Sequence, residues 1–180
     1  MSDIVIFDTE TTGLVEPEPI PLDKQPQIIE FAGIKLDKDL NEIDRLEFLV
    51  DPGVQITPLI TKITGINSAM VKGQGDFASH FHKLQDFFVG VKEYVAHNLM
   101  FDHDMLSFEL RRIDALTQFP WPPVRTCTVE DTHHLNGYRL NLTKLHKYCF
   151  DKEFKNAHRA MPDVEALTNC YIHLKKKELI

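Results

Sequence analysis

The sequence predicts an α/β fold, a three-layer arrangement in which helices flank a mixed five-stranded sheet. Three strand-like segments occupy much of the first 50 residues, and from there helices alternate with two further strands. A chain of 180 residues, 43% of them hydrophobic, has the size of one domain with its own core. We therefore expect a single domain over residues 1–180.

The first 50 residues contain the first three expected strands. The apolar run IVIF, residues 4–7, suits a central strand that is buried on both faces. The proline-rich segment from Val15 to Gln27 cannot continue a sheet or start a long helix, so we expect a surface loop there. Residues 28–36 and 42–50 are two further strands, and the polar turn DKDLN between them predicts a hairpin.

The rest of the chain alternates helices with the last two strands. Strands are expected at residues 91–96 and near 124–126. A short helix or turn is expected at 58–70, and phenylalanine and leucine residues at helical spacing predict a helix over 77–89. The remaining helices are expected over residues 101–113, 128–135, 142–149 and 162–176.

Composition argues against export and against membrane insertion. The longest apolar runs are far shorter than the ~20 residues that cross a bilayer, and the start MSDIV lacks the charged and apolar regions of a signal peptide. Three cysteines, Cys127, Cys149 and Cys170, form no CxxC pair and cannot all pair within the chain. We therefore expect a soluble, cytoplasmic protein without a membrane partner, whose thiols are reduced and buried.

Charge is distributed unevenly along the chain. The net charge of −7 by itself opposes a polyanionic partner. Residues 138–159 nevertheless hold six basic and two acidic residues, a local balance of 6 − 2 = +4, so the remainder carries −7 − 4 = −11. Two interpretations stay open, a solvated helix face or a path that guides a nucleic acid. The basic residues are Arg139, Lys144, Lys147, Lys152, Lys155 and Arg159.

The opening strand ends on two acids, Asp8 and Glu10, in the sequence VIFDTETTGL. Because side chains alternate along a strand, both acids lie on one face, about 7 Å apart. They also lie at the carboxyl end of the strand, where open α/β sheets bind ligands. Neighbouring desolvated carboxylates are costly unless a proton or a cation compensates them. We favour a bound cation over the alternative, two surface acids in a turn.

Two further acids lie on the apolar stripes of later helices. In NLMFDHDMLSFELRRI, the stripe that contains Asp102 continues through leucines four and eight residues later. In HRAMPDVEAL, Asp163 shares its stripe with Ala166 and Leu167. Pro162 is tolerated only in the first turn of a helix, which places Asp163 in that turn. An acid there also complements the helix dipole, so either acid alone is ambiguous.

Taken together, the four acids predict an oxygen-rich site suited to Mg²⁺ or Mn²⁺. Two such ions about 3.5–4 Å apart can hold the attacking and leaving oxygens of a phosphodiester. They would also offset the acid excess where a phosphate must approach. Hydrolysis further needs a base, and a histidine, with an ordinary pKa of about 6.5, suits neutral pH. His158, five residues before Asp163, is the candidate.

Three motifs resemble those of a known family. FDTETTGL, HNLMFDHDML and HRAMPDVEAL are similar, in order and spacing, to the exonuclease motifs of the DnaQ-like (DEDDh) 3′-to-5′ exonucleases, which include the proofreading subunit of bacterial DNA polymerase III. The resemblance extends over essentially the whole chain. It implies a ribonuclease H-like fold and a two-metal hydrolysis that releases nucleoside 5′-monophosphates from a 3′ end.

The resemblance also implies a role for each residue that matches a motif. Asp8 would bridge both ions, Glu10 and Asp163 would bind the ion that carries the attacking water, and Asp102 would support the second ion. His158 would be the general base. The candidate substrate-binding residues are Thr11, Thr12, Leu59, Thr64, His97 and Asn98.

The segment ITGI departs from the pattern of the polymerase III subunit, which has a histidine in HGI where this chain has Thr64. One substrate contact is therefore expected to be lost or replaced. Leu59, Ile63 and Ile66 suggest either an apolar wedge against the terminal bases or, as we favour, part of the core.

The sequence indicates the type of reaction more clearly than the class of nucleic acid that serves as substrate. A two-metal site does not discriminate between sugars, whereas contacts to the 2′-hydroxyl do. The similarity to proofreading subunits favours single-stranded DNA 3′ ends, with a DNA polymerase or replication complex in trans as a candidate partner. RNA ends or short oligoribonucleotides are the alternative. A binding module without turnover is disfavoured because all four acids and His158 are retained.

The neighbouring His103 and Asp104 suggest a second, unrelated enzyme class. An HD-type phosphohydrolase uses this dipeptide, but its architecture is all-helical. The strand that bears Asp8 has no place in such a fold, which excludes that class in favour of the nuclease hypothesis.

Overall fold

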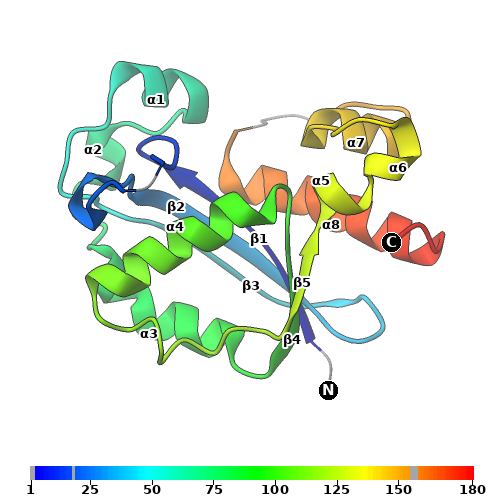
Figure 1. Ribbon diagram of the computed structural model, residues 1–180, viewed down its shortest axis with the longest axis horizontal. Helices are drawn as coiled ribbons and strands as arrows, with labels where there is room; N and C mark the ends of the chain where they lie inside the picture. Colours follow the sequence, from blue (N-terminus) through cyan, green and yellow to red (C-terminus); the bar gives the residue numbers. More distant parts are fainter. Residues whose placement is uncertain (1–2, 18, 155–157) are drawn as a thin grey trace.

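The computed structural model describes residues 3–17, 19–154 and 158–180 and shows an α/β fold in three layers (Figure 1). One five-stranded sheet forms the middle layer, in the order β3-β2-β1-β4-β5. The strands are β1 (Asp3–Thr11), β2 (Ile28–Leu36), β3 (Glu42–Leu49), β4 (Val91–Ala96) and β5 (Val124–Cys127). The predicted fold class and the five strands are confirmed.

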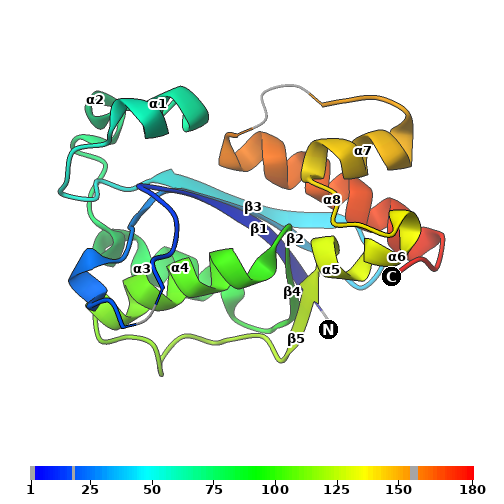
Figure 2. The ribbon, with the colours of Figure 1, turned by 45° about the horizontal axis from the view of Figure 1, so that its top comes forward.

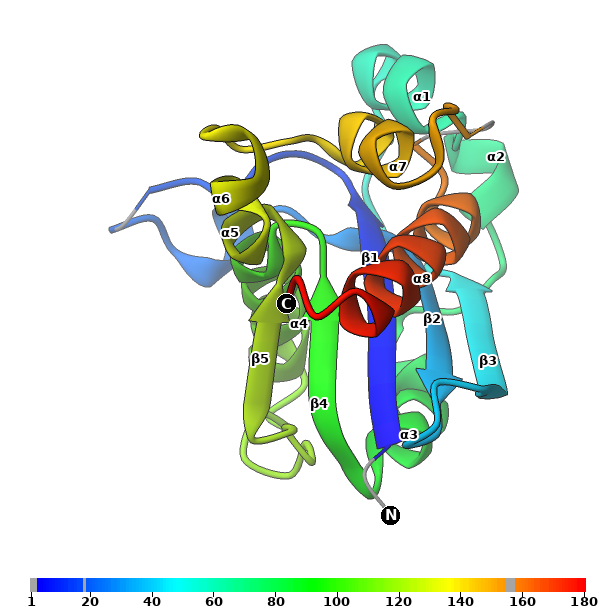
Figure 3. The same cartoon turned by 90° about the vertical axis from the view of Figure 1, so that its right-hand side faces the viewer.

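The sheet is mixed because its two halves pair differently. β1 pairs antiparallel with β2, and β2 with β3, whereas β1–β4 and β4–β5 are parallel. Pairing between β1 and β4 runs only as far as Ile6, opposite Val95, but pairing with β2 continues to Thr11. The carboxyl half of β1 is therefore not paired with β4, and side chains from helices can approach it from that side. Figure 3 shows the strands side by side.

Helices cover both faces of the sheet (Figure 2). On one face lie α3 (Phe77–Phe88) and α4 (Leu99–Arg112), and on the other lies α8 (Ala160–Lys176), with α7 (Leu142–Phe150) against it. Alternation along β1 supplies both cores: Val5 and Phe7 pack in the cluster with α3 and α4, while Ile4 and Ile6 pack in the cluster with α8. The first strand is thus buried on both faces, as predicted.

The remaining helices are short: α1 (Pro58–Thr64), α2 (Ser68–Val71), α5 (Thr128–Asp131), α6 (His133–Asn136) and a 3-10 turn at Leu22–Lys24. The helix predicted over 128–135 is divided at Thr132, whose hydroxyl donates to the Thr128 carbonyl and whose ψ of 2° leaves helical geometry. The helix predicted from residue 101 begins at Leu99 instead.

Two expectations from composition can be compared with the structure. Among the described residues, none of the helices has both the length and the apolar character that spanning a bilayer demands. The cysteines are free, as expected, but only Cys170 is buried. The expectation of buried thiols is wrong for Cys127 and Cys149, which are half-buried because they lie at the margins of their clusters.

Candidate active site

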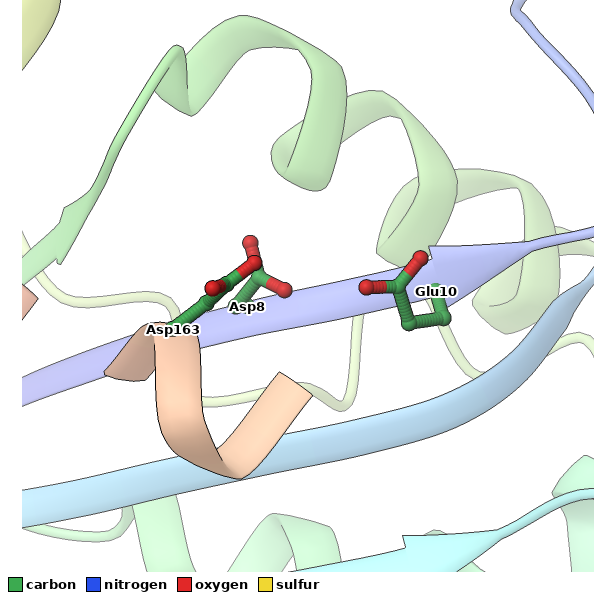
Figure 4. Close-up of side chains that lie close together, drawn as sticks. All are labelled: Asp8, Glu10 and Asp163. Carbon is green, nitrogen blue, oxygen red and sulfur yellow. The ribbon is translucent and has the colours of Figure 1, made fainter. Parts of the chain in front are cut away.

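Three acids from two elements meet on the α8 side of the sheet. Asp8 and Glu10 project from β1, and Asp163 reaches them from the first turn of α8 (Figure 4). One carboxylate oxygen of each lies within 4.8 Å of the others. The two-residue periodicity of β1 and the inward stripe of α8, both evident in the sequence, bring these groups together. The predicted convergence of these three acids is confirmed.

The start of α8 places Asp163 and leaves one of its oxygens without a partner. The helix begins at Ala160, two residues earlier than predicted, with Pro162 still inside the first turn. The His158 backbone N–H donates to Asp163 Oδ2 at 3.1 Å. The other oxygen, Oδ1, is buried and has no hydrogen-bond partner among the described residues. A buried acceptor without a partner is costly, and a bound cation would satisfy it.

Asp102 approaches from the opposite side, on α4. It is 2% exposed, and its Oδ1 accepts hydrogen bonds from the Thr9 N–H at 3.0 Å and the Thr9 hydroxyl at 2.7 Å. The carboxylate is thus fixed to the strand residue between Asp8 and Glu10. Asp102 does not belong to the group of three, but it lies close enough for its charge to raise the pKa of Asp8.

Burial raises the pKa values of all four acids, and repulsion from neighbouring carboxylates adds to it at Asp8, Glu10 and Asp163. Burial is the largest cause in each case, and it raises the pKa of Glu10 to about 8, of Asp102 to about 7 and of Asp163 to about 6. The pKa of Asp8 lies well above its ordinary value, because of burial and then the charges of Asp102 and Glu10. Nearby cations would keep these groups ionised.

The donor set fits hard divalent ions. It consists of carboxylate oxygens with no sulfur or imidazole among the three clustered ligands, which is the chemistry that Mg²⁺ and Mn²⁺ prefer over zinc. The buried Asp163 Oδ1 has a free coordination position, and the raised pKa values mark a site in need of positive charge. The residues present therefore fit such an ion.

His158 lies two residues before the start of α8, with an exposed side chain and a left-handed backbone at φ 69°. Its own backbone N–H is bonded to Asp163, so the residue is tied to the acid cluster. The exposed ring is free to turn toward a substrate that enters from solvent. Its predicted role as a base remains a prediction.

Thr11 and Thr12 shape the turn after β1. The Thr11 hydroxyl donates to the Gly13 carbonyl at 2.6 Å. The Thr12 N–H donates to the Gln27 carbonyl, and the Thr12 hydroxyl accepts from the Gln27 N–H. These bonds fix the backbone after the first motif against the start of β2. The predicted contact between this backbone and a terminal nucleotide remains a prediction.

His97 and Asn98 connect β4 to α4 and make internal contacts. Both ring nitrogens of His97 are engaged, one with the Thr128 hydroxyl at 2.9 Å and the other with the Leu140 carbonyl at 3.0 Å. Burial lowers the pKa of His97 to about 4. No ring nitrogen is left for the predicted substrate contact. Asn98 is exposed, has φ 76° and accepts from Arg139 through its side-chain oxygen.

The α1 region corrects one structural expectation. Ile66 is fully buried, but Leu59 is 65% exposed and Ile63 is 48% exposed, so a core role for these two is wrong. The reason is that α1 packs through its other face, where Ile60 joins the Ile66 cluster. The Thr64 hydroxyl donates to the Ile60 carbonyl and is not directed to solvent. Exposure of Leu59 is compatible with its predicted contact to a substrate.

The basic segment carries less free charge than its composition indicates. Arg139 pairs with Glu130 at 2.8 Å, and Arg159 pairs with the buried Glu30 at 2.6 Å. Lys155 lies outside the described residues. Two of the six basic residues are therefore paired with acids outside the segment, which weakens the interpretation of this segment as a path for a nucleic acid. Of the described basic residues, Lys144 and Lys147 lie on α7, whereas Arg139, Lys152 and Arg159 lie outside helices.

Sequence reasoning missed two residues that contact the site. Thr9 holds Asp102, and Glu30 lies opposite Glu10 on β2 and is 1% exposed. A signal for Glu30 was available, since it is the only charged residue in the apolar run IIEFAGI. No comparable signal marks Thr9, because threonine is common in strands.

Comparison with known proteins adds three findings. The family model RNase_T, described as Exonuclease, matches residues 5–171. A DNA polymerase III PolC-type from Halalkalibacterium halodurans is 34% identical over 167 residues, which covers 92% of this chain but 11% of that relative. The chain therefore spans about a tenth of the length of this relative.

Solved structures share the fold. Exonuclease X in complex with 5′ overhanging duplex DNA is 23% identical, with a TM-score of 0.68, and the match covers 96% of this chain and 92% of the other. The nuclease domain of 3′hExo, a DEDDh family member bound to rAMP, is 17% identical, with a TM-score of 0.75, 98% of this chain covered and 92% of the other. The ribonuclease H-like architecture expected from the motifs is confirmed.

Proposed function

The chain belongs to the exonuclease family described by the RNase_T model and is of the DnaQ-like (DEDDh) type, and on that premise we propose that it removes nucleotides from the 3′ end of single-stranded DNA. The product would be a nucleoside 5′-monophosphate. The observation that carries the proposal is the convergence of Asp8, Glu10 and Asp163, with Asp102 fixed beside them.

We propose that the site binds two divalent ions, Mg²⁺ or Mn²⁺. One would be held by Asp8, Glu10 and Asp163, whose oxygens already lie within 4.8 Å of one another. The second would be held by Asp8 and Asp102. When bound, the ions supply charge stabilisation for the attacking and leaving oxygens of a phosphodiester. The raised pKa values of the four acids support this proposal, because neighbouring cations would favour the ionised forms that burial, and for Asp8 and Glu10 also the neighbouring carboxylates, disfavour.

The protein's own residues would orient the carboxylates of the site and deprotonate the attacking water. His158 would accept the proton of the attacking water, and its exposed position allows the ring to approach the substrate. Asp163 holds the His158 backbone through one oxygen and presents the other to the site. Thr9 holds Asp102 in place through two hydrogen bonds, so this carboxylate needs no rearrangement when substrate arrives.

DNA is the favoured polymer because curated relatives are DNA polymerases. The relative from Halalkalibacterium halodurans carries that name, and its matched segment is 34% identical to this chain. RNA 3′ ends or short oligoribonucleotides are the second candidate, since a two-metal site does not by itself discriminate between sugars, whereas contacts to the 2′-hydroxyl do. We also propose a DNA polymerase or replication complex as the partner in trans, which co-elution with a replicative polymerase on gel filtration would test.

The deciding experiment offers four substrates side by side with Mg²⁺, Mn²⁺ or chelator. These are single-stranded DNA labelled at its 3′ end, the same strand labelled at its 5′ end, a mismatched duplex and a short RNA. We expect early release of the 3′ label as mononucleotide, progressive shortening of the 5′-labelled strand, and no reaction with chelator.

The matched control is Asp8→Asn, which keeps side-chain size and removes the charge. Release of the 3′ label by this variant at the wild-type rate, or shortening from the 5′ end, would contradict the proposal. Faster degradation of the RNA than of the DNA would move the assignment to the second candidate.

A further inference from the structure

A fifth buried carboxylate lies beside the site. Glu30 is on β2, directly opposite Glu10 in the antiparallel register. Alternation puts it on the same face as Ala32 and Ile34, which pack against α8. The side chain is 1% exposed, in a strand whose residues are all buried. A charge in such a place is retained only when it is paired and hydrogen-bonded.

Both oxygens of Glu30 are engaged by the start of α8. The Arg159 guanidinium donates through Nε, at 3.1 Å to Oε2, and through its terminal nitrogen, at 2.6 Å to Oε1. The Ala160 N–H donates to Oε2 at 2.9 Å. This is a two-pronged guanidinium contact plus a bond to the first amide of the helix. Because both of its oxygens already accept hydrogen bonds, Glu30 differs in role from the acids that are proposed to bind metal.

These contacts hold the segment that carries two functional groups. Arg159 directly follows His158, and Asp163 lies one turn further along α8. His158 has φ 69°, a left-handed conformation that side-chain-bearing residues adopt at a cost. Its N–H bonds to Asp163, so residues 158–163 form one bonded unit. Glu30 joins this unit to β2, and β2 is hydrogen-bonded to β1, which carries Asp8 and Glu10.

We propose that Glu30 and Arg159 are positioning residues, which fix His158 and Asp163 relative to the acids of β1. The inference rests on the proposed function and deepens it. Arg159 also lines a cleft of about 670 Å³ between α1 and α8. Its stem passes beside Gly65, at the end of α1.

The test variant is Glu30→Gln, which keeps size and one acceptor but cannot accept two prongs of Arg159. We expect kcat to fall by roughly 10–100-fold, as for other groups that orient metal ligands, while KM changes little. Glu42→Gln is the matched control, because Glu42 forms a similar pair with Arg45 on the exposed face of β3. This control should change kcat by less than about 2-fold.

A double-mutant cycle separates positioning from simple stabilisation. If Glu30 positions His158, Glu30→Gln should cost less in a His158→Ala background than in the wild type, and the remaining loss would act through Asp163. Equal losses in both backgrounds, or an unchanged kcat in the single variant, would overturn the inference. Arg159→Lys, which keeps the charge but loses the planar fork, serves if Glu30→Gln does not fold, and the same loss is expected.

Two readouts need no hydrolysis and so distinguish this inference from the proposed function. Hydrogen exchange at the Ala160 amide should be faster in Glu30→Gln, and Mn²⁺ should bind more weakly by titration calorimetry, with Glu42→Gln unchanged in both. Wild-type protein that fails to degrade 3′ ends would refute the proposed function alone. Unchanged Ala160 exchange and unchanged Mn²⁺ affinity would refute the positioning role, whatever the activity.

Discussion

The first turns of α4 and α8 lie on opposite sides of β1, and each brings one acid to it, but the two acids are held differently. Asp102 on α4 accepts two hydrogen bonds from Thr9. Asp163 on α8 accepts one from His158, and its second oxygen has no partner in the part of the chain that the structure describes. On the α4 side the protein itself supplies two donors to one oxygen of Asp102, whereas on the α8 side a buried oxygen of Asp163 has no donor among the described residues. The difference predicts that Asp163 depends more strongly than Asp102 on a bound cation.

The largest loss of activity should come from substitution of Asp8, the acid that is proposed to contribute to both metal ions. Asp8→Asn removes the charge between the two helix starts, and losing metal-dependent stabilisation of several kcal/mol lowers the rate roughly 10³-fold or more. The measurement is mononucleotide release under saturating Mg²⁺. A variant that retained a tenth of the wild-type rate would show that the two sides do not depend on a common ligand.

His158→Ala breaks the α8 side without touching a carboxylate. Removal of a general base should slow turnover by about 10²–10⁴-fold at neutral pH. Mn²⁺ affinity should stay at the wild-type value, because only the His158 backbone contacts Asp163. Rates and calorimetric titrations on the same preparations decide the matter. Full activity at neutral pH would refute the assignment of His158 as the base.

Stability without metal should separate the two acids by sign. Asp163→Asn removes a carboxyl group whose pKa is raised by burial. Because the ionised form of this group destabilises the metal-free fold, the metal-free variant should unfold at a higher temperature than the wild type. Asp102→Leu also removes a carboxyl group whose pKa is raised by burial, but it leaves both buried Thr9 donors without an acceptor at about 1–3 kcal/mol each, so this variant should unfold at a lower temperature. Thermal unfolding in chelator measures both. Shifts of the unfolding temperature with the same sign in both variants would contradict the difference in how Asp102 and Asp163 are held.

The pH dependence of the metal-free protein should follow from the acids on both sides of β1. Burial raises the pKa values of Asp163, Asp102 and Glu10 to about 6, about 7 and about 8, so the folded state keeps protons that the unfolded state releases near pH 4. The associated stability is complete below about pH 4 and is lost as pH rises through 6 and then 8. Denaturant midpoints should fall over this range in chelator and much less with Mg²⁺. A flat profile in chelator would contradict the raised pKa values.

Much of this arrangement could be predicted from sequence because it depends on local periodicity. The alternation along β1 gave the shared face of Asp8 and Glu10, and Pro162 gave the first turn of α8. The five strands follow from apolar runs and turn residues. These features depend on neighbours in the chain, which a single sequence contains.

The missed features depend on contacts between distant segments. Glu30 and Arg159 are 129 residues apart, and the sequence around either residue does not indicate that the two form a pair. His97 matched a motif, but its ring is used by Thr128 and Leu140, which pattern alone does not reveal. Leu59 has the residue type of a core position, yet α1 turns it outward. Side-chain orientation and long-range pairing decide these cases.

The most direct test of the account is a crystal structure with Mn²⁺ and its anomalous scattering. We expect one peak bonded to Asp8, Glu10 and the unpartnered oxygen of Asp163, and a second between Asp8 and Asp102. Two results would contradict the claim that these acids converge to bind divalent ions. One is manganese bound only elsewhere, and the other is an absence of metal at these acids at saturating Mn²⁺.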